Sequence, residues 1–245
     1  MPSGERLDLA LVRRGLATTR SQARHLIRSG RVRVDERKVE RPAHPVKPGS
    51  RLEISEPDRV YVSRGGEKLE AALEAMGVEV SGLRCLDVGA SAGGFTQCLL
   101  RRGAAQVTAV DVGRQQLHPS LRGDRRVRVF EECDIRTVSP ARLGAPFDLA
   151  VVDVSFISLT RVLEPIRRML GPQAPALALI KPQFELGPGG AGRKGVVRDP
   201  GDRRRAVDRV REFAAGTGWQ LGEVVESPLE GDRGNREFFI RLTKS

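Results

Sequence analysis

Hydrophobic residues follow two different patterns along the chain, and the change falls near residue 62. From residue 63 onward, short apolar runs alternate with stretches in which apolar residues recur every three or four positions. The runs predict strands at residues 84–88, 106–110, 127–130, 149–152, 176–180, 220–225 and 237–242, with helices between most of them. This alternation predicts an α/β fold with a mostly parallel sheet that helices cover on both faces.

The last two predicted strands are separated only by residues 226–236, a connection too short to contain a crossover helix. Two strands joined in this way pair in the antiparallel direction. The prediction is therefore a Rossmann-like sheet of seven strands whose last strand is antiparallel. This arrangement is typical of methyltransferases that use S-adenosylmethionine.

The first 54 residues predict a small separate domain of α+β type. Apolar residues recur at helical spacing from Leu7, and Gly15 follows them as a stop signal. A second helix and two short strands are predicted at residues 21–29, 31–34 and 51–54. A polar, proline-containing stretch then indicates a linker. The predicted organisation is a domain at residues 1–54, a linker at 55–62 and a second domain at 63–245.

The chain carries a formal charge of +11, with 42 lysines and arginines against 31 aspartates and glutamates. This balance favours a polyanionic partner such as nucleic acid, although an otherwise ordinary basic protein can share it. The three cysteines and three histidines form no metal-binding pattern, so we expect no metal site. The sequence has no signal peptide and no long apolar segment, which predicts a cytoplasmic protein without a membrane partner.

Arginines repeat every four residues along the second predicted helix and continue into the strand that follows. Residues at this spacing share one helix face. A charged stripe is most often a solvated face, but its continuation into the next element favours a surface that tracks phosphates. The candidate phosphate-binding residues are Arg6, Arg20, Arg24, Arg28, Arg31 and Arg33.

Residues 86–96 are the most informative segment, a predicted strand that passes through small residues into a helix. Open α/β sheets bind cofactors at such a turn, and glycines there let a ligand approach the backbone. The spacing Gly89-x-x-x-Gly93-Gly94 matches neither the dinucleotide motif nor the triphosphate-binding loop. The acidic Asp87 suits a cationic ligand without phosphates, such as S-adenosylmethionine, although such turns also occur as packing features. The candidate contacts are Asp87, Gly89, Ala90, Ser91, Gly93, Gly94 and Phe95.

Two further strand ends supply candidate contacts to the same ligand. Asp111 closes the second predicted strand, where a carboxylate can hold ribose hydroxyls. Asp134 and Ile135 follow the third strand and are placed to meet an adenine ring. We therefore expect the ligand to lie across the ends of the first three strands.

Four charged residues stand at the ends of predicted elements near this crevice, namely Lys68, Asp153, Lys181 and Glu237. The carboxyl ends of parallel strands share one edge, so Asp153 and Lys181 should be neighbours. A structural ion pair is the ordinary interpretation of such a pair. However, only six of the 42 cationic residues are lysines, and lysine, unlike arginine, can release its proton beside a second cation. We therefore predict that Lys181 is a general base assisted by Lys68, with Asp153 and Glu237 fixing its orientation.

The N-terminal part resembles the small RNA-binding domain shared by a small-subunit ribosomal protein and many pseudouridine synthases. The resemblance is carried by residues 6–8, 21–24, 26–32 and 34. It implies that the basic face binds RNA and performs no chemistry.

The rest of the chain resembles the TlyA family of ribosomal RNA 2′-O-methyltransferases, a branch of the FtsJ-like methyltransferases. The matching segments are residues 61–69, 86–96, 152–159, 180–185, 194–199, 227–229 and 234–238. The resemblance implies S-adenosylmethionine as cofactor, ribosomal RNA or a ribosomal subunit as partner, and methylation of cytidine ribose. It further implies that Lys68, Asp153, Lys181 and Glu237 form a catalytic tetrad, and that the modification affects sensitivity to capreomycin-type antibiotics.

The family divides by length, and its shorter members modify only the large ribosomal subunit. The short flanks of this chain predict that large-subunit RNA is favoured, with the small subunit as the alternative. Two other functions stay open, a membrane-active hemolysin, a label that this family has carried, and a non-catalytic ribosome-assembly factor that binds RNA. The lack of apolar segments argues against the first, and the complete tetrad argues against the second. Nothing in the sequence predicts an oligomeric state.

Overall fold

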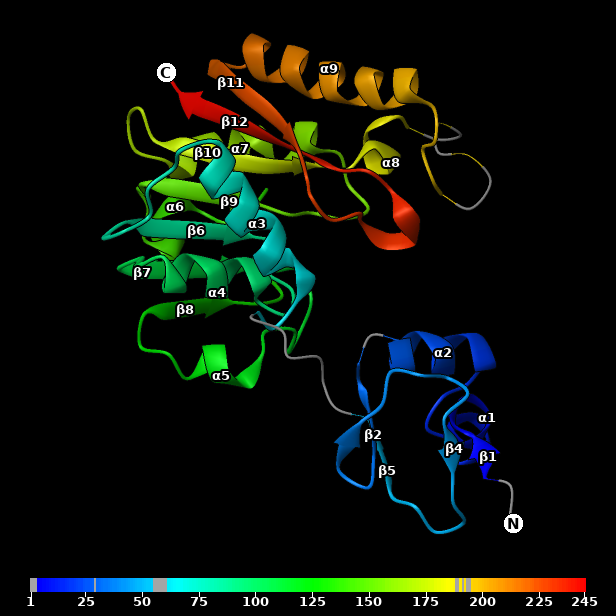
Figure 1. Ribbon diagram of the computed structural model, residues 1–245. Coiled ribbons are helices and arrows are strands. Elements are labelled where there is room, and N and C mark those ends of the chain that lie inside the picture. Colours follow the sequence, from blue (N-terminus) through cyan, green and yellow to red (C-terminus); the bar gives the residue numbers. More distant parts are fainter. Residues whose placement is uncertain (1–3, 29, 55–60, 188–189, 191, 193–194) are drawn as a thin grey trace. The chain divides into compact units, whose positions relative to one another are not determined.

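The computed structural model describes residues 4–28, 30–54, 61–187, 190, 192 and 195–245. The chain divides into two compact units, residues 1–59 and 60–245 (Figure 1). Most of the predicted linker, residues 55–60, lies outside the described residues, as does Ser29 at the end of the second predicted helix.

The larger unit contains a seven-stranded sheet in the order β11–β12–β10–β9–β6–β7–β8. Its strands are β6 (Arg84–Val88), β7 (Gln106–Val110), β8 (Val127–Phe130), β9 (Leu149–Val152), β10 (Pro175–Ile180), β11 (Trp219–Glu226) and β12 (Phe238–Lys244). Neighbouring strands among β6 to β10 pair in parallel, whereas β12 pairs antiparallel with both β10 and β11. The predicted Rossmann-like sheet with a reversed last strand is confirmed.

Helices cover both faces of this sheet because its central strands are apolar on both sides (Figure 1). The helices are α3 (Arg64–Ala75), α4 (Gly94–Arg101), α5 (Pro119–Arg122), α6 (Pro140–Leu143), α7 (Leu163–Met169), α8 (Pro182–Glu185) and α9 (Pro200–Gly216), with 3₁₀ turns η1 (Leu159–Arg161) and η2 (Asp232–Gly234). On one face, Leu69 of α3 and Leu99 of α4 pack in the same core as Leu177 of β10. On the other face, Ile166 of α7 and Val210 of α9 share a second core with the sheet.

The smaller unit has the predicted α+β architecture. Its elements are β1 (Glu5–Arg6), α1 (Leu7–Arg13), α2 (Arg20–Arg28), β2 (Val32–Val34), β3 (Arg37–Lys38), β4 (Pro45–Val46) and β5 (Leu52–Ile54). The strands form a three-stranded sheet, β3–β2–β5, and a separate β1–β4 pair. Leu7 and Leu11 of α1, Ile27 of α2 and Val32 of β2 are buried in one core, which leaves the opposite faces of the helices for charged residues.

The longest described helix, α9, has 17 residues and carries charged side chains along its length. Its buried residues are Ala206, Val210 and Ala214, a narrow stripe that packs on the sheet. Within the described part of the chain, no helix is long and apolar enough to cross a membrane.

Candidate active site

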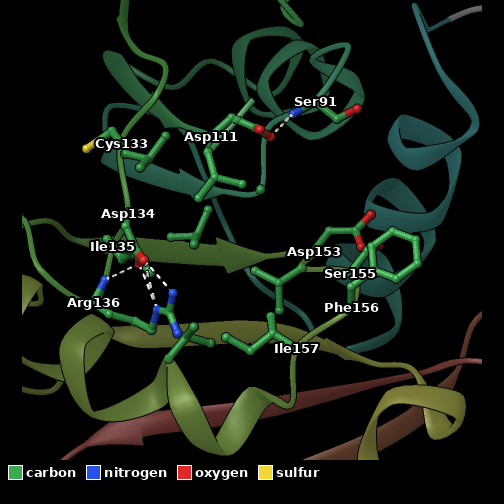
Figure 2. A pocket seen from close by; sticks show the side chains of 16 residues that line it. Ser91, Asp111, Cys133, Asp134, Ile135, Arg136, Asp153, Ser155, Phe156 and Ile157 are labelled. Carbon is green, nitrogen blue, oxygen red and sulfur yellow. Dashed lines mark hydrogen bonds and ion pairs between the residues drawn. The ribbon is translucent and has the colours of Figure 1, made fainter. Parts of the chain in front are cut away.

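A cavity of about 670 Å³ opens at the carboxyl ends of the central parallel strands (Figure 2). Its walls come from the residues after four strands, with Gly89 following β6, Asp111 following β7, Ile135 beyond β8 and Asp153 following β9. Open parallel sheets bind ligands at this edge, where the connections leave a crevice. The cavity therefore occupies the crevice that the strand pattern predicts.

The turn after β6 can follow its path only because two of its residues are glycines. Gly89 has a φ of +83°, and a Cβ added there would lie 2.2 Å from the carbonyl oxygen of Asp153. Gly93, immediately before α4, has a φ of +94°. This conformation brings the Ser91 N–H to Asp111, whose Oδ2 accepts its hydrogen bond at 2.8 Å (Figure 2). The turn after β6 and the end of β7 are thereby fixed to each other at the cavity wall.

Of the predicted ligand contacts, the structure brings Gly89, Ser91, Asp111, Asp134 and Ile135 to the cavity. Asp87, Ala90, Gly93, Gly94 and Phe95 are not among the residues that line this cavity, and their contact with a ligand stays a prediction. A Cβ added at Gly94 would lie 2.1 Å from Oγ of Ser63 and 2.8 Å from the backbone nitrogen of Gly66. Phe95 packs on Phe239, with ring centroids 6.0 Å apart. These positions thus serve the close packing of α4 against α3 and the sheet.

Asp134 reaches the cavity wall, but Arg136 holds its carboxylate (Figure 2). Arg136 Nε donates to Oδ1 at 2.9 Å, and Nη2 pairs with Oδ2 at 2.5 Å. The hydrogen bonds from Arg136 keep the pKa of Asp134 below its usual range. The side chain of Asp134 is therefore engaged, and Ile135 provides the apolar surface at this end of the cavity.

Asp87 is buried beneath the glycine turn and faces α4, because successive side chains of a strand point to opposite faces. Its Oδ2 accepts a 2.6 Å hydrogen bond from the Thr96 hydroxyl, whereas Oδ1 has no hydrogen-bond partner among the described residues. Burial raises the pKa of Asp87 to about 7, against the hydrogen bonds from Thr96, and the charge of Asp153 adds to the increase. Asp87 is thus a buried acid near the end of β6, hydrogen-bonded to α4.

The raised pKa of Asp87 predicts that the protein loses stability as the pH rises. Between pH 4 and pH 7 the folded state binds a proton that the unfolded state has released, so the free energy of unfolding falls over this interval. Asp87→Asn is expected to remove about 2 kcal/mol of the decrease between pH 5 and pH 8. Urea unfolding of the ligand-free protein at pH 5 and at pH 8 measures this decrease in the free energy of unfolding. The control is Asp148→Asn, which changes a carboxylate before β9 that accepts from the backbone of Arg84; equal pH dependence in both variants would contradict the prediction.

Lys181 and Asp153 form an ion pair at the cavity rim. Lys181 follows β10 and Asp153 follows β9, and these strands pair in parallel, so both side chains leave the same edge of the sheet. The Nζ of Lys181 lies 2.5 Å from Oδ1 of Asp153 and donates to Oγ of Ser155 at 2.8 Å. The two partners hold the amine in one position, with exposed side-chain fractions of 13% for Lys181 and 25% for Asp153. The predicted neighbourhood of these two residues is thus present.

Lys68 and Glu237 form a second, more deeply buried pair. The Nζ of Lys68 in α3 donates to Oε2 of Glu237 at 2.6 Å, and their side chains are 8% and 2% exposed. Glu237 immediately precedes β12 and does not begin it, as the sequence pattern had suggested. The backbone at Gly231 closes over the carboxylate, since a Cβ there would lie 1.8 Å from Oε1 of Glu237. Water is therefore largely excluded from this pair.

The register of β10 and β12 brings the two ion pairs to one edge of the sheet. Ile180 pairs with Phe238 in antiparallel register, so the next position along each strand sets Lys181 beside Glu237. An antiparallel strand starts where its parallel neighbours end, which is why a residue before β12 joins residues that follow β9 and β10. All four predicted catalytic residues therefore converge. In the described part of the chain, no group of three or more His, Cys, Asp or Glu side chains could hold a metal ion.

Three residues near the cavity were not predicted from the sequence as site residues. Ser155 accepts from Lys181. Phe156 is 91% exposed, has a φ of +64° and contacts the ring of Phe184, with centroids 5.2 Å apart. Glu185 is buried and accepts from the Ser158 hydroxyl at 2.6 Å, and thus ties α8 to the segment that forms the cavity wall. The signal for Phe156 is an aromatic residue in the polar turn after a strand, at a strained backbone conformation of the kind found at functional sites.

The predicted phosphate-binding arginines divide into two groups in the smaller unit. Arg6, Arg20 and Arg24 surround the buried carboxylate of Asp8. Arg28 is exposed at the end of α2, and Arg33 donates to the carbonyl oxygen of Glu36, while Arg31 is only partly exposed. The stripe along α2 is therefore not a uniform solvated face, because two of its members, Arg20 and Arg24, share one acidic partner with Arg6.

Comparison with known proteins assigns both units. The profile of the FtsJ-like methyltransferases matches residues 61–244, and that of the S4 domain matches residues 5–52. The chain belongs to the FtsJ-like methyltransferase family. The first profile covers the sheet, the cavity and all four charged residues, and the second covers the basic helices.

Relatives of similar length support the TlyA resemblance. The chain is 48% identical to the 16S/23S rRNA (cytidine-2′-O)-methyltransferase TlyA of Mycobacterium tuberculosis, over 97% of this chain and 89% of that protein. It is 37% identical to Hemolysin A of Brachyspira hyodysenteriae, over 97% and 99% of the two chains. A solved structure from Streptococcus thermophilus that carries a hemolysin name superposes with a TM-score of 0.79 at 36% identity, covering 100% of this chain and 90% of that chain. The predicted family is thus confirmed.

Proposed function

We propose that the protein transfers a methyl group from S-adenosylmethionine to the ribose 2′-hydroxyl of a cytidine in ribosomal RNA. The observation that carries this proposal is the Lys181–Asp153 pair, in which Asp153 lines the same cavity as Asp111 (Figure 2). A proton acceptor and a ribose-binding carboxylate on one strand edge suit methyl transfer to a hydroxyl. The TlyA relative of M. tuberculosis, named for this reaction, supports the choice of acceptor.

The cavity residues fit S-adenosylmethionine in size and chemistry. A cavity of about 670 Å³ lies in the range of small-molecule sites. Asp111 would hold the ribose hydroxyls, since an ionised carboxylate has acceptor capacity beyond the two backbone N–H groups of Ser91 and Gly113 that it binds. Gly89 lets a ligand approach the turn, and Ile135 offers an apolar contact for the adenine. When bound, S-adenosylmethionine would supply an electrophilic methyl group.

Asp111→Ala is expected to weaken S-adenosylmethionine binding by about 10–100-fold, the loss for a hydrogen bond to a charged group. Isothermal titration calorimetry of the full chain measures the dissociation constant. Asp124→Ala is the matched control, because Asp124 lies in a connection of the same sheet, between α5 and β8, but pairs with Arg126 outside the cavity. Unchanged affinity in Asp111→Ala would remove this residue from the cofactor site.

The charged residues would prepare the acceptor oxygen. A ribose hydroxyl is a weak nucleophile until its proton leaves, and Nζ of Lys181 would accept that proton. The O–H bond would break as the N–H bond on Nζ forms, and the oxygen would take up the methyl group that S-adenosylmethionine supplies. Asp153 and Ser155 orient the amine, and the buried Lys68–Glu237 pair fixes the neighbouring wall. In-line attack then depends on positioning, which rigid strand ends provide.

Phe156 would position the target nucleotide. Its ring is exposed beside Ser155, the hydrogen-bond partner of Lys181, and it contacts Phe184. An exposed aromatic face can stack on a base that has left its helix. We assign to Phe156 the contact with the base whose ribose meets Lys181.

We further propose that residues 1–54 bind the RNA, that residues 63–245 perform the chemistry and that the reaction takes place in the cytoplasm. The test is incubation of the full chain with radiolabelled S-adenosylmethionine and isolated large or small ribosomal subunits, followed by mapping of the labelled nucleotide. Label on a cytidine ribose is expected, with the large subunit preferred. Label on isolated small subunits would overturn that preference.

Experiments on the same purified protein distinguish methyl transfer from two alternative functions, RNA binding without catalysis and membrane lysis. RNA binding without label would indicate a non-catalytic assembly factor. The hemolysin name of the Brachyspira relative makes lysis the second alternative, and leakage from protein-free liposomes measures it. Label without leakage supports the proposal over both.

A further inference from the structure

Asp8 is an acidic residue at the centre of the basic face in the smaller unit. Its side chain is fully buried and accepts four hydrogen bonds from arginines. Arg6 donates from Nε at 3.0 Å and from Nη2 at 3.2 Å, while the Nε atoms of Arg20 and Arg24 donate at 2.9 and 3.1 Å. The hydrogen bonds from Arg6, followed by those from Arg20 and Arg24, hold the pKa of Asp8 well below its usual range. The cluster is therefore ionised and carries a net charge of +2.

All three arginines donate to Asp8 from Nε, and Arg6 donates from Nη2 as well, which leaves each side chain with further terminal N–H donors. The exposed fractions of their side chains are 43% for Arg6, 47% for Arg20 and 44% for Arg24. Arg20 and Arg24 use only Nε toward Asp8, so neither terminal nitrogen contacts this carboxylate. An arginine has five donors in a planar fork that fits a phosphate. Each of these side chains can thus bind Asp8 and a phosphate at the same time.

We infer that Asp8 is a positioning residue that holds Arg6, Arg20 and Arg24 as a pre-organised site for RNA phosphates. The inference rests on the proposed RNA-methyltransferase function and goes beyond it in naming what orders the basic face. Arg20 and Arg24 lie one turn apart on α2, and Arg6 leads into α1, so the carboxylate fixes cations from two elements. A long side chain that is already ordered loses less freedom when it binds.

The arrangement predicts a change in RNA affinity opposite to the change that net charge alone predicts. Removal of a negative charge from a basic surface should strengthen binding to a polyanion. If Asp8 instead orders the arginines, its removal weakens RNA binding although the net charge rises. If the cluster only fastens α1 to α2, the RNA affinity of a variant without Asp8 should depend on its net charge alone and should therefore increase.

The test measures binding of the full chain to protein-free large-subunit ribosomal RNA over a range of salt concentrations. Arg20→Lys and Arg24→Lys keep the charge but lack the fork, and each is expected to weaken binding about fivefold or more. The matched control is Arg13→Lys in α1, because Arg13 also pairs with a carboxylate, Glu5, at 2.6 Å; it should stay within about twofold of wild type. The slope of log Kd against log salt should be unchanged in all three variants, since no charge is lost.

Asp8→Asn is expected to weaken binding by at least as much, with circular dichroism verifying that the variant is folded. Arg20→Gln, in contrast, should lower the salt slope by about one, because one phosphate contact is lost. Equal affinity of Arg20→Lys, Arg24→Lys and the Arg13→Lys control would overturn the inference and leave the proposed function standing. Absence of RNA binding by the wild-type chain would overturn both.

Discussion

Lys181→Ala is expected to reduce methyl transfer by about 10²–10⁴-fold, the usual contribution of a general base. The amine is held 2.5 Å from Asp153 and 2.8 Å from Ser155, and its removal leaves both of these partners without it. S-adenosylmethionine binding should change little, because Lys181 does not line the cavity. A loss in kcat at unchanged cofactor affinity is the signature of an interaction made in the transition state.

Lys181→Arg makes this prediction sharper. Arginine keeps the positive charge and can still pair with Asp153, but it cannot give up its proton. The base assignment therefore predicts that Lys181→Arg is about as inactive as Lys181→Ala, whereas a purely electrostatic role predicts recovery. The control is Lys244→Ala, which removes a lysine from the other end of β12, where Nζ donates to the carbonyl oxygen of Leu170 at 2.5 Å. Near-normal turnover in Lys181→Ala would refute the assignment.

The sheet and the four charged residues follow from the sequence because each depends on a strong local signal. Strands such as β9 are buried on both faces and read as uninterrupted apolar runs, so the polar residue after each run is conspicuous. Asp153 and Lys181 are such residues. Their proximity then follows from a rule that needs no side-chain geometry, namely that parallel strands end at a common edge.

The direction of individual side chains is harder to predict from the sequence. An apolar run does not tell which face of the sheet a polar member occupies, so the hydrogen bond of Asp87 to Thr96 in α4 could not be predicted. The shared pairing of Arg20 and Arg24 with Asp8 could not be predicted, because Asp8 is distant from both in sequence. Phe156 stands in a turn without periodicity, so its sequence signal is limited to an aromatic residue shortly after a predicted strand. Long-range contacts, and not local propensities, decide these positions.

Lys68→Met and Glu237→Gln are each expected to lower the free energy of unfolding by about 3–5 kcal/mol, because each leaves one buried charge without its partner. The side chains are 8% and 2% exposed, and the backbone at Gly231 prevents the carboxylate from moving toward solvent. The double variant Lys68→Met/Glu237→Gln removes both charges at nearly constant volume and should recover most of that stability. Urea unfolding of the ligand-free protein measures the three values, and their non-additivity gives the coupling within the pair.

Activity of the double variant then separates a structural pair from a functional one. If the pair only stabilises the fold, methyl transfer should return together with stability. Its position beside Lys181, set by the β10–β12 register, predicts the opposite result, namely a stable protein whose turnover stays at least about tenfold below wild type. The exposed pair Arg236–Glu226 at the same end of β12 is the control, since its double replacement by glutamine should leave stability within about 1 kcal/mol. Full recovery of turnover in Lys68→Met/Glu237→Gln would remove Lys68 and Glu237 from the reaction and leave the chemistry to Lys181 and Asp153 alone.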